Sequence, residues 1–370
     1  MRAGLYIHFP FCRTKCPYCH FYSLAGRDDL FPEWWDGLRR EAERHVRENL
    51  IIDTVYLGGG TPSLLRPDDL RAIRQLLDAR FWLKADEFTL EANPDVEDDS
   101  AARGWRQAGV TRLSIGVQSF DDGVLAALGR DYWAERARDF CLAARDAGYE
   151  SVSLDLMIGV PGESLKTSER TLEETLRFGP DHVSLYILEN VEGLPFEKIL
   201  RDHPVDEDAL ADIYRMFQRG LESAGLRQYE ISNFARPGKE CRHNLRYWRY
   251  EPFLGLGPSA CSHVGGRRWC NRRELGAWTE ALRKGEPITE EMTELPPEAG
   301  VKEALIFGLR LVEGVDLGAL GECFGVDPET AFAAEIAELE RDGWLVRDGD
   351  TVRIPPDRFL LSNHVFSKFV

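Results

Sequence analysis

Short apolar runs alternate with charged segments of helical spacing through the first half of the chain. Each run is followed by Gly, Pro, Asn or Ser, which is typical of a β-strand. The six runs are Leu5–His8, Thr54–Leu57, Glu87–Glu91, Arg112–Val117, Ser151–Met157 and His182–Leu188. The helical segments between them are Trp34–Arg47, Pro67–Leu77, Ser100–Ala108, Leu125–Ala147 and Glu163–Phe178. This alternation predicts a parallel sheet with helices outside it, either an incomplete barrel or an open sheet.

A different pattern begins near Val205. The spacing predicts a long helix over Asp206–Ala224, ended by Gly225, and then an irregular stretch over Gln228–Asn271. The last elements are predicted as helices at Ala299–Leu311 and Pro328–Arg341 and a hairpin of Trp344–Val346 with Thr351–Ile354. We therefore expect three parts, at residues 1–227, 228–295 and 296–370, of which the last is a small winged-helix-like α+β domain.

Charge and composition exclude several classes of protein. The chain has 63 acidic and 46 basic residues and a formal charge of −17, which argues against nucleic acid as a partner. No apolar run approaches the roughly 18 residues that cross a membrane, and the first residues are too polar for a signal peptide. We expect a cytoplasmic protein, with association to a membrane only through partners. In that compartment the eight cysteines are expected to be thiols or metal ligands.

Three of these cysteines, Cys12, Cys16 and Cys19, form a C-x3-C-x2-C pattern in the loop after the first strand. An iron–sulfur cubane normally has four cysteine ligands, so three leave one iron open for another ligand. The amino and carboxylate groups of S-adenosylmethionine can chelate such an iron, and an electron from the cluster can then cleave the sulfonium. The alternatives are a zinc site completed by His20 and three unrelated thiols.

Polar residues follow the other strands at the same predicted edge of the sheet. The glycine-rich segment Gly58–Pro62 follows the second strand, Glu91 ends the third and Gln118 ends the fourth. Asp155 lies within the apolar fifth strand, where a carboxylate needs a partner. Ligands bind at this edge in parallel α/β proteins, and ribose hydroxyls and an ammonium group suit these acceptors. Arg130 could hold a carboxylate. The alternative for each residue is a local cap or pair.

These residues belong to a pattern that resembles the radical S-adenosylmethionine superfamily, and within it the oxygen-independent coproporphyrinogen III oxidase group. The matching motifs are Tyr6-Ile-His-Phe-Pro-Phe-Cys12, Gly58-Gly-Gly-Thr-Pro-Ser63, Thr89-Leu-Glu-Ala-Asn-Pro94, Ser114-Ile-Gly-Val-Gln-Ser-Phe120, Leu128-Gly-Arg130, Leu154-Asp-Leu156 and Tyr229-Glu-Ile-Ser-Asn-Phe234. The oxidases resemble C-x3-C-x2-C-x-C, but the last position here is Phe21. His243-Asn-Leu-Arg-Tyr-Trp248 instead matches the H-N-x-x-Y-W motif of the heme chaperones called HemW.

The resemblance implies a partial (β/α)6 TIM-like barrel with a small carboxy-terminal domain. It implies that Cys12, Cys16 and Cys19 hold a [4Fe–4S] cluster. The residues implied to contact S-adenosylmethionine are Tyr6, Tyr18, Gly59, Gly60, Thr61, Glu91, Gln118, Arg130 and Asp155. The chain departs from the family at three positions, which are His20 for Asp, Tyr132 for His and Cys261 for His.

The stretch Gln228–Asn271 has the residues that a heme needs. It supplies aromatic side chains for the ring, arginines for the propionates, and His243, Cys261 and His263 as candidate axial ligands. The alternative for His243 is that it ties down a loop by hydrogen bonds.

The resemblance implies a heme chaperone that binds the cluster, S-adenosylmethionine and heme and delivers heme to acceptor proteins, with respiratory-chain subunits among the expected partners. The alternatives are a decarboxylating coproporphyrinogen III oxidase, a radical methyltransferase and a structural zinc protein. Phe21 argues against the oxidase, and whether the chain is an enzyme stays open. The sequence indicates no particular oligomeric state.

Overall fold

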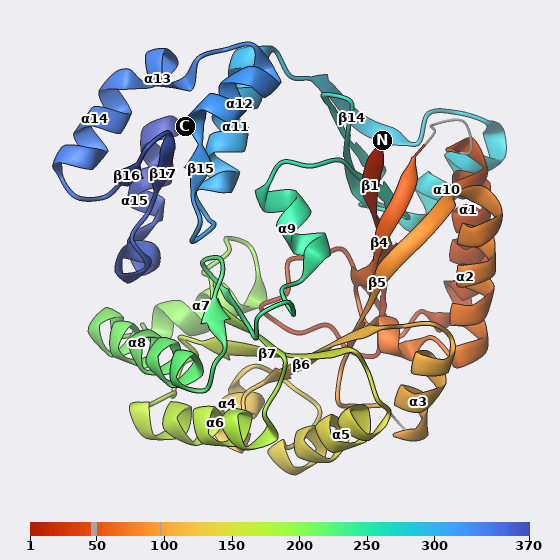
Figure 1. Ribbon diagram of the computed structural model, residues 1–370. Coiled ribbons are helices and arrows are strands. Elements are labelled where there is room, and N and C mark those ends of the chain that lie inside the picture. The colour runs from red at the N-terminus through yellow and green to blue at the C-terminus, as the bar shows by residue number, and fades with distance from the viewer. Residues whose placement is uncertain (46–49, 97) are drawn as a thin grey trace.

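The computed structural model describes residues 1–45, 50–96 and 98–370. The described residues form a 12-stranded sheet in the order β14-β13-β12-β11-β1-β4-β5-β6-β7-β8-β10-β9. Figure 1 shows β1, β4 and β5 of this sheet side by side. The centre of the sheet consists of six parallel strands, β1 (Arg2–Phe9), β4 (Ile51–Gly59), β5 (Trp82–Ala92), β6 (Arg112–Gln118), β7 (Ser151–Ile158) and β8 (His182–Ile187). All six predicted strands are therefore confirmed, and they form the partial barrel that the resemblance implies.

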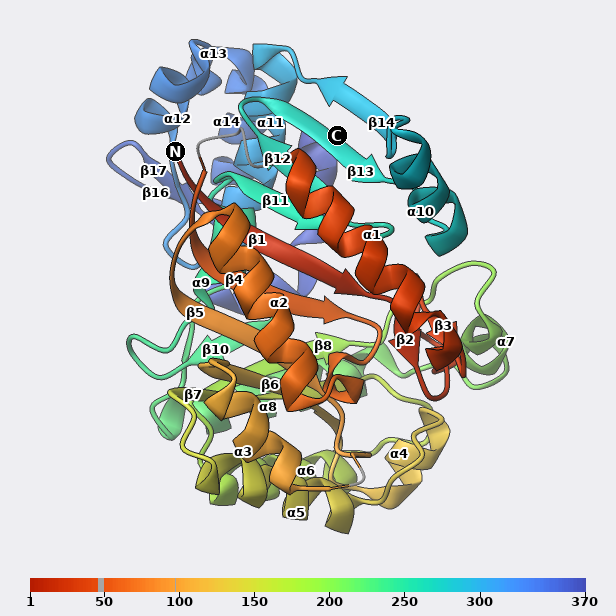
Figure 2. The same ribbon diagram turned by 90° about the vertical axis from the view of Figure 1, so that its right-hand side faces the viewer.

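Helices cover the outside of these strands (Figure 2). They are α1 (Phe31–Arg44), α2 (Pro67–Arg80), α3 (Ser100–Gln107), α4 (Asp122–Ala127), α5 (Ala134–Asp146), α6 (Leu165–Phe178) and α8 (Glu207–Ser223). The predicted helix Leu125–Ala147 is wrong, because the chain leaves the helix at Gly129, whose φ of 68° is left-handed, and enters a second helix at Ala134. The predicted end of the first helix at Arg47 lies outside the described residues.

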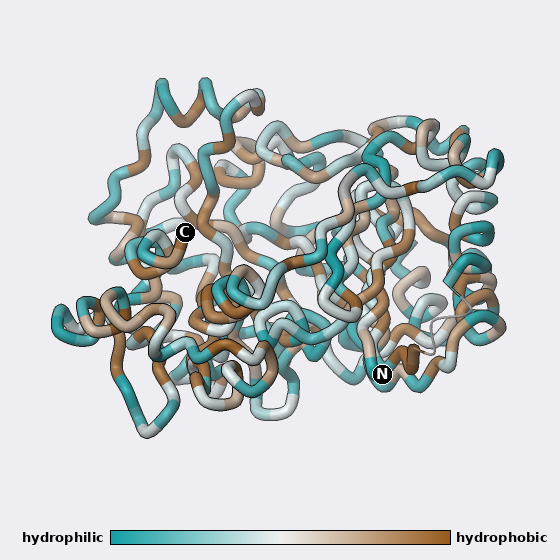
Figure 3. Tube along the Cα trace, turned by 90° about the horizontal axis from the view of Figure 1, so that it is seen from above, coloured by the Kyte–Doolittle hydropathy of each residue, from teal (hydrophilic) through white to brown (hydrophobic). Residues whose placement is uncertain are grey.

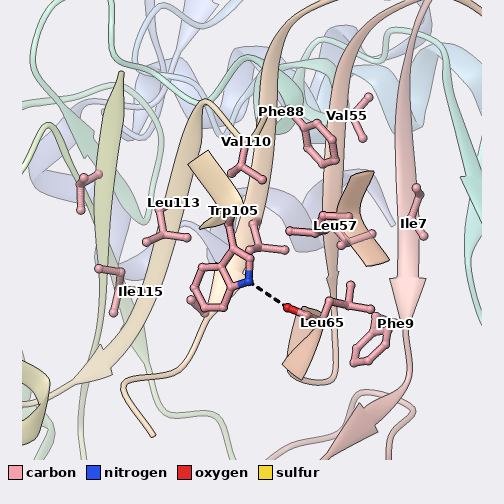
Figure 4. Close-up of a cluster of buried hydrophobic side chains, with 14 of the residues drawn as sticks. Ile7, Phe9, Val55, Leu57, Leu65, Phe88, Trp105, Val110, Leu113 and Ile115 are labelled. Carbon is pink, nitrogen blue, oxygen red and sulfur yellow. Dashed lines mark hydrogen bonds between the residues drawn. The ribbon is translucent and has the colours of Figure 1, made fainter. Parts of the chain in front are cut away.

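The main hydrophobic core lies between the sheet and these helices. Leu57 projects from β4 and Leu113 and Ile115 project from β6, and none of their surface is exposed (Figure 4). Trp105 on α3 fills the space beside them, and its indole Nε1 donates a hydrogen bond of 2.8 Å to the carbonyl oxygen of Leu65. Hydrophilic positions lie on the outer turns of the peripheral helices (Figure 3). Burial of each such apolar side chain stabilises the fold by about 1.5–3 kcal/mol.

The segment predicted as irregular, Gln228–Asn271, contains regular elements, so that prediction is wrong. Together with the residues around it, this part forms α7 (Pro195–Asp202), β9 (Arg227–Gln228), β10 (Asn233–Ala235), α9 (Arg242–Trp248), β11 (Phe253–Leu256), β12 (Cys261–Val264), β13 (Arg267–Asn271), α10 (Leu275–Lys284) and β14 (Thr289–Glu294). The strands extend both edges of the central sheet, with β11 parallel to β1 and β10 antiparallel to β8. They are two to six residues long, too short for a periodic signal.

The carboxy-terminal part has its own small sheet and hydrophobic cluster. Its elements are α11 (Pro297–Gly308), β15 (Val315–Asp316), α12 (Leu317–Phe324), α13 (Pro328–Ala331), α14 (Ala333–Arg341), β16 (Val346–Asp348), β17 (Thr351–Arg353) and α15 (Asn363–Phe366). The predicted hairpin is confirmed as β16 and β17, whereas the predicted helix Pro328–Arg341 is two helices that meet at Phe332.

The two ends of the central strands face different parts of the molecule. The carboxy-terminal part and α9 lie at the amino ends of the strands, and the two-residue strands β2 (Phe11–Cys12) and β3 (Leu24–Ala25) lie with α7 at the carboxyl ends (Figure 2). Within the described chain, no helix is both long and apolar enough to cross a membrane.

Candidate functional site

A cavity of about 450 Å³ opens at the carboxyl ends of the central strands. This volume is within the range of about 300–1,000 Å³ that small-molecule sites usually have. The predicted residues on its wall are Cys12, Cys16, Cys19, Tyr18, Gly59, Gly60, Thr61, Glu91, Gln118, Arg130 and Asp155. Tyr6 is the exception, because it is not among the lining residues; its hydroxyl is hydrogen-bonded to Nδ1 of His8 at 3.0 Å. The structure thus brings together all but one of the residues predicted for the cluster and S-adenosylmethionine.

The three cysteines lie on a loop that backbone hydrogen bonds fix in place. Gly26 N donates to the carbonyl oxygen of Cys12 at 2.9 Å, and Cys19 N donates to that of Cys16 at 3.1 Å. Burial raises the pKa of the Cys12 and Cys19 thiols, and the neighbouring cysteines raise it further. The thiols are therefore close enough to disfavour one another's charge, and a metal centre between them would reverse that effect.

The chemistry of this loop fits an iron–sulfur cluster. Cys12, Cys16 and Cys19 all lie on the wall of one cavity. Cysteine thiolates are the ligands that such a cluster takes.

The glycine segment after β4 forms part of the cavity wall and leaves no room for side chains. Gly59 has a φ of 112°, and a Cβ atom there would lie 2.6 Å from the imidazole of His8. A Cβ on Gly60 would lie 2.5 Å from the carbonyl oxygen of Phe11. Thr61 N donates a hydrogen bond of 2.8 Å to that same oxygen. Glycine is thus required where the cysteine loop packs against this segment.

Glu91 lies at the end of β5 with both carboxylate oxygens bonded. The Tyr56 hydroxyl donates to Oε1 at 2.8 Å, and Gly59 N donates to Oε2 at 3.1 Å. Burial raises the pKa of Glu91 to about 7, and the charge of Asp155 acts in the same direction. A carboxyl group with this pKa exchanges its proton near neutral pH, so a bound ammonium group would favour its ionised form.

Asp155 is held by hydroxyl groups rather than by a cation. The Ser114 hydroxyl lies 3.0 Å from both carboxylate oxygens, and the Ser153 hydroxyl lies 3.3 Å from Oδ1. Burial raises the pKa of Asp155, although these serine hydroxyls oppose the change. The carboxylate keeps unused acceptor capacity on the cavity wall, where a ligand hydroxyl could reach it.

Two neighbouring side chains carry buried polar atoms that have no partner among the described residues. These atoms are Oε1 of Gln118 and Nε of Arg130. Gln118 also has a φ of 63°, a strained conformation that occurs often at ligand sites. Because an unpaired buried polar atom costs about 1–3 kcal/mol, the arrangement fits a polar ligand that completes these bonds.

Arg130 is fixed by residues on three sides. Its guanidinium donates to the Tyr18 hydroxyl at 2.6 Å and to Oδ1 of Asn93 at 3.3 Å. It also lies 5.9 Å from the ring centre of Tyr132, whose own hydroxyl donates to the carbonyl oxygen of Gly116 at 2.6 Å. Tyr132, one of the family departures, is therefore a buried support for Arg130.

His243, a predicted axial ligand for heme, lies at the opposite end of the sheet on α9. Its side chain is fully buried, with Nδ1 bonded to the Thr54 hydroxyl at 2.9 Å and Nε2 to the Tyr247 hydroxyl at 2.8 Å. Burial, and then the charge of Arg246, lowers its pKa to about 3. Both ring nitrogens are thus engaged in this structure, which is the arrangement that the hydrogen-bonding alternative for His243 describes.

The two other predicted heme ligands lie on β12. Cys261 forms a disulfide with Cys270, its partner across β12 and β13, and in this form it has no thiolate for iron. The same disulfide contradicts the expectation that the cysteines are thiols or metal ligands. The imidazole of His263 is buried 4.3 Å from the ring of Tyr250, beside the carboxy-terminal part. Neither residue is on the cavity wall.

Sequence reasoning missed several residues of the cavity wall. They include Tyr56, Asn93, Ser114, Met157 and Tyr186. A signal was present for Asn93 and Ser114, because both lie in motifs that the resemblance matched. Tyr56 could have been found from strand alternation, since it lies two positions before Gly58 in β4 and therefore projects from the same face, toward Glu91.

Comparisons with known proteins agree with this architecture. Residues 6–175 match the Radical SAM superfamily and residues 295–359 match the HemN C-terminal domain. The solved structure of coproporphyrinogen III oxidase (HemN) from Escherichia coli superposes with a TM-score of 0.88 at 22% identity, over 100% of this chain and 90% of that chain. At this identity the match shows the fold alone. The fold and the family matches define a radical SAM protein with a HemN-type carboxy-terminal domain.

Sequence relatives narrow the assignment. The heme chaperone HemW of Bacillus subtilis is 31% identical over 373 residues, which is 99% of this chain and 98% of the relative. The heme chaperone HemW of Mycobacterium tuberculosis is 36% identical over 348 residues, 92% of this chain and 89% of the relative. The chain belongs to the HemW family.

Proposed function

We propose that this protein is a heme chaperone that binds a [4Fe–4S] cluster, S-adenosylmethionine and heme, and delivers heme to acceptor proteins. The names of its relatives support heme as the cargo. The observation that carries the proposal is the single cavity in which the three cysteine thiols meet a set of incompletely bonded polar side chains. Respiratory-chain subunits are the acceptors that we expect.

Cys12, Cys16 and Cys19 would hold the cluster, and the remaining cavity wall would hold S-adenosylmethionine. Glu91 would accept a hydrogen bond from its ammonium group, Asp155 would accept bonds from ribose hydroxyls, and Arg130 would donate to its carboxylate. When bound, the cluster supplies an electron that can cleave the sulfonium of S-adenosylmethionine. The protein's own contribution is to exclude water and to orient the ligand by these charges.

The test begins with protein purified and reconstituted without oxygen. Iron and sulfide analysis, together with the electron paramagnetic resonance spectrum of the reduced protein, reports the cluster. A Cys19→Ser variant is expected to lose that signal. A Cys323→Ser variant is the matched control, because Cys323 is an exposed thiol on α12 outside the cavity and should leave the signal unchanged.

Heme is then titrated into the reconstituted protein, and the loaded protein is mixed with apomyoglobin as a general heme acceptor. Saturable binding followed by transfer supports the chaperone. The same sample receives coproporphyrinogen III, reductant and S-adenosylmethionine. Formation of protoporphyrinogen would assign the chain to the oxidase instead, and a protein with an intact cluster that binds no heme would refute the proposal.

A further inference from the structure

The eight histidines of the chain differ sharply in what their imidazoles can still bind. His8, His182 and His243 are buried, and both ring nitrogens of each are hydrogen-bonded. The exposed histidines are His20, His203 and His364. Of the histidines that the structure describes, His20 is the one that lies on the cavity wall. Its nitrogens make no hydrogen bond to any residue described, so a lone pair is free for a metal.

An exposed aromatic side chain stands beside this imidazole. Phe21 is 55% exposed on the cavity edge, and its ring centre lies 4.5 Å from that of His20 with an angle of 30° between the planes. Its ring offers an apolar surface that a ligand at the cavity edge could contact. An imidazole bound to heme iron stands on edge to the porphyrin plane. Phe21 would therefore also present its edge to that plane, the geometry that aromatic groups prefer.

Charge at the cavity edge orients such a ligand. Lys15 is exposed on the same loop, and its ammonium group donates to the carbonyl oxygen of Phe21 at 3.3 Å. Glu189, also exposed, lies on the part of the wall that follows β8. Propionates would therefore point toward Lys15 and away from Glu189. Leu188 and Val191 are partly buried near Glu189 and would face the apolar edge of the ring.

We propose that heme binds across the mouth of the cavity with His20 as its axial ligand, Phe21 edge-on to the porphyrin and a propionate at Lys15. The inference rests on the proposed function, since it takes heme as the cargo. In this arrangement the cavity has two occupants. S-adenosylmethionine would lie against the inner wall, and the larger porphyrin would lie at the opening. The position would place the cargo beside the cysteine loop.

The test compares His20→Ala with His364→Ala. His364 is the matched control, because it is also exposed and also lies 4.5 Å from an aromatic ring, that of Trp344, but on the carboxy-terminal part. Both variants are titrated with ferric heme, with and without prior reconstitution of the cluster. Magnetic circular dichroism and electron paramagnetic resonance identify the axial ligand. His20→Ala is expected to lose the histidine signature and to bind heme about tenfold more weakly or worse, and His364→Ala is expected to match the wild type.

Added imidazole should restore the histidine signature in His20→Ala, which a merely misfolded variant would not allow. Unchanged spectra and affinity in His20→Ala would overturn the assignment while leaving the proposed chaperone intact. Absence of heme binding in the wild type would instead refute the proposed function. A Lys15→Gln variant that binds heme as tightly as the wild type at low salt would overturn the propionate contact.

Discussion

Removal of the Tyr56 hydroxyl should change how the binding of S-adenosylmethionine depends on pH. In the structure that hydroxyl donates one of the two hydrogen bonds that Glu91 accepts, at 2.8 Å, and the pKa of Glu91 is about 7 because the group is buried. A Tyr56→Phe change keeps the ring in place, where it lies 5.3 Å from the imidazole of His243. The change therefore isolates the hydrogen bond.

The magnitude follows from the charge on the acceptor. A hydrogen bond to an ionised group contributes about 1.5–3 kcal/mol, so its loss raises the pKa of Glu91 by roughly one to two units. The ionised fraction at pH 7 then falls from about one half to roughly 1–10%. If the ligand requires the carboxylate, its affinity at pH 7 falls about 5- to 50-fold and recovers as the pH rises above the new pKa.

Isothermal titration calorimetry from about pH 6 to about pH 9.5 measures this dependence. Tyr247→Phe is the control, since it removes a buried phenol that bonds His243 at 2.8 Å and not Glu91. Wild type and control should lose affinity below about pH 7, as Glu91 takes up a proton. A loss in Tyr56→Phe that is the same at every pH would mean that the hydroxyl contacts the ligand directly and would refute the reasoning.

Three further changes test other parts of the structure. Gly60→Ala places a Cβ atom 2.5 Å from the carbonyl oxygen of Phe11, so it should weaken S-adenosylmethionine binding by about 1–3 kcal/mol and lower the iron content after reconstitution. Arg246→Met leaves the buried Asp53 without its main cation and should cost about 3–5 kcal/mol of unfolding free energy, measured by urea titration. Trp105→Phe keeps an aromatic ring but leaves a buried carbonyl unpaired, and should cost about 1–3 kcal/mol in the same assay.

The central sheet could be predicted from the sequence because its signal is local. Strands that are buried on both faces are rich in apolar residues. Every residue of Arg112–Gln118 is buried, and Leu113, Ile115 and Val117 supply its apolar signal. The same strands predict where the cavity lies, because residues that follow the carboxyl ends of parallel strands meet at one edge of the sheet. Glu91 and Asp155 were placed in this way, and the structure brings them to the same wall.

The edges of the sheet could not be predicted in this way. Strands β11 to β13 have four or five residues each, and partner strands rather than their own composition stabilise them. Pairing across β12 and β13 also brings Cys261 next to Cys270, a contact that depends on register and that spacing along the chain does not reveal. His20 was a candidate metal ligand from the sequence. Its exposure beside Phe21 depends on the conformation of the cysteine loop, which the sequence does not reveal.

The contacts of His243 give the segment His243–Trp248 a structural role in this fold. Its imidazole lies against the ring of Tyr56, with 5.3 Å between the ring centres, and the Tyr56 hydroxyl holds Glu91. On the other side of α9, Trp248 lies 4.3 Å from the guanidinium of Arg310 in the carboxy-terminal part. The helix therefore connects that part to the back of the ligand cavity through packed rings. A histidine in this place supports the ligand site from behind, at the end of the sheet opposite the heme position that we propose.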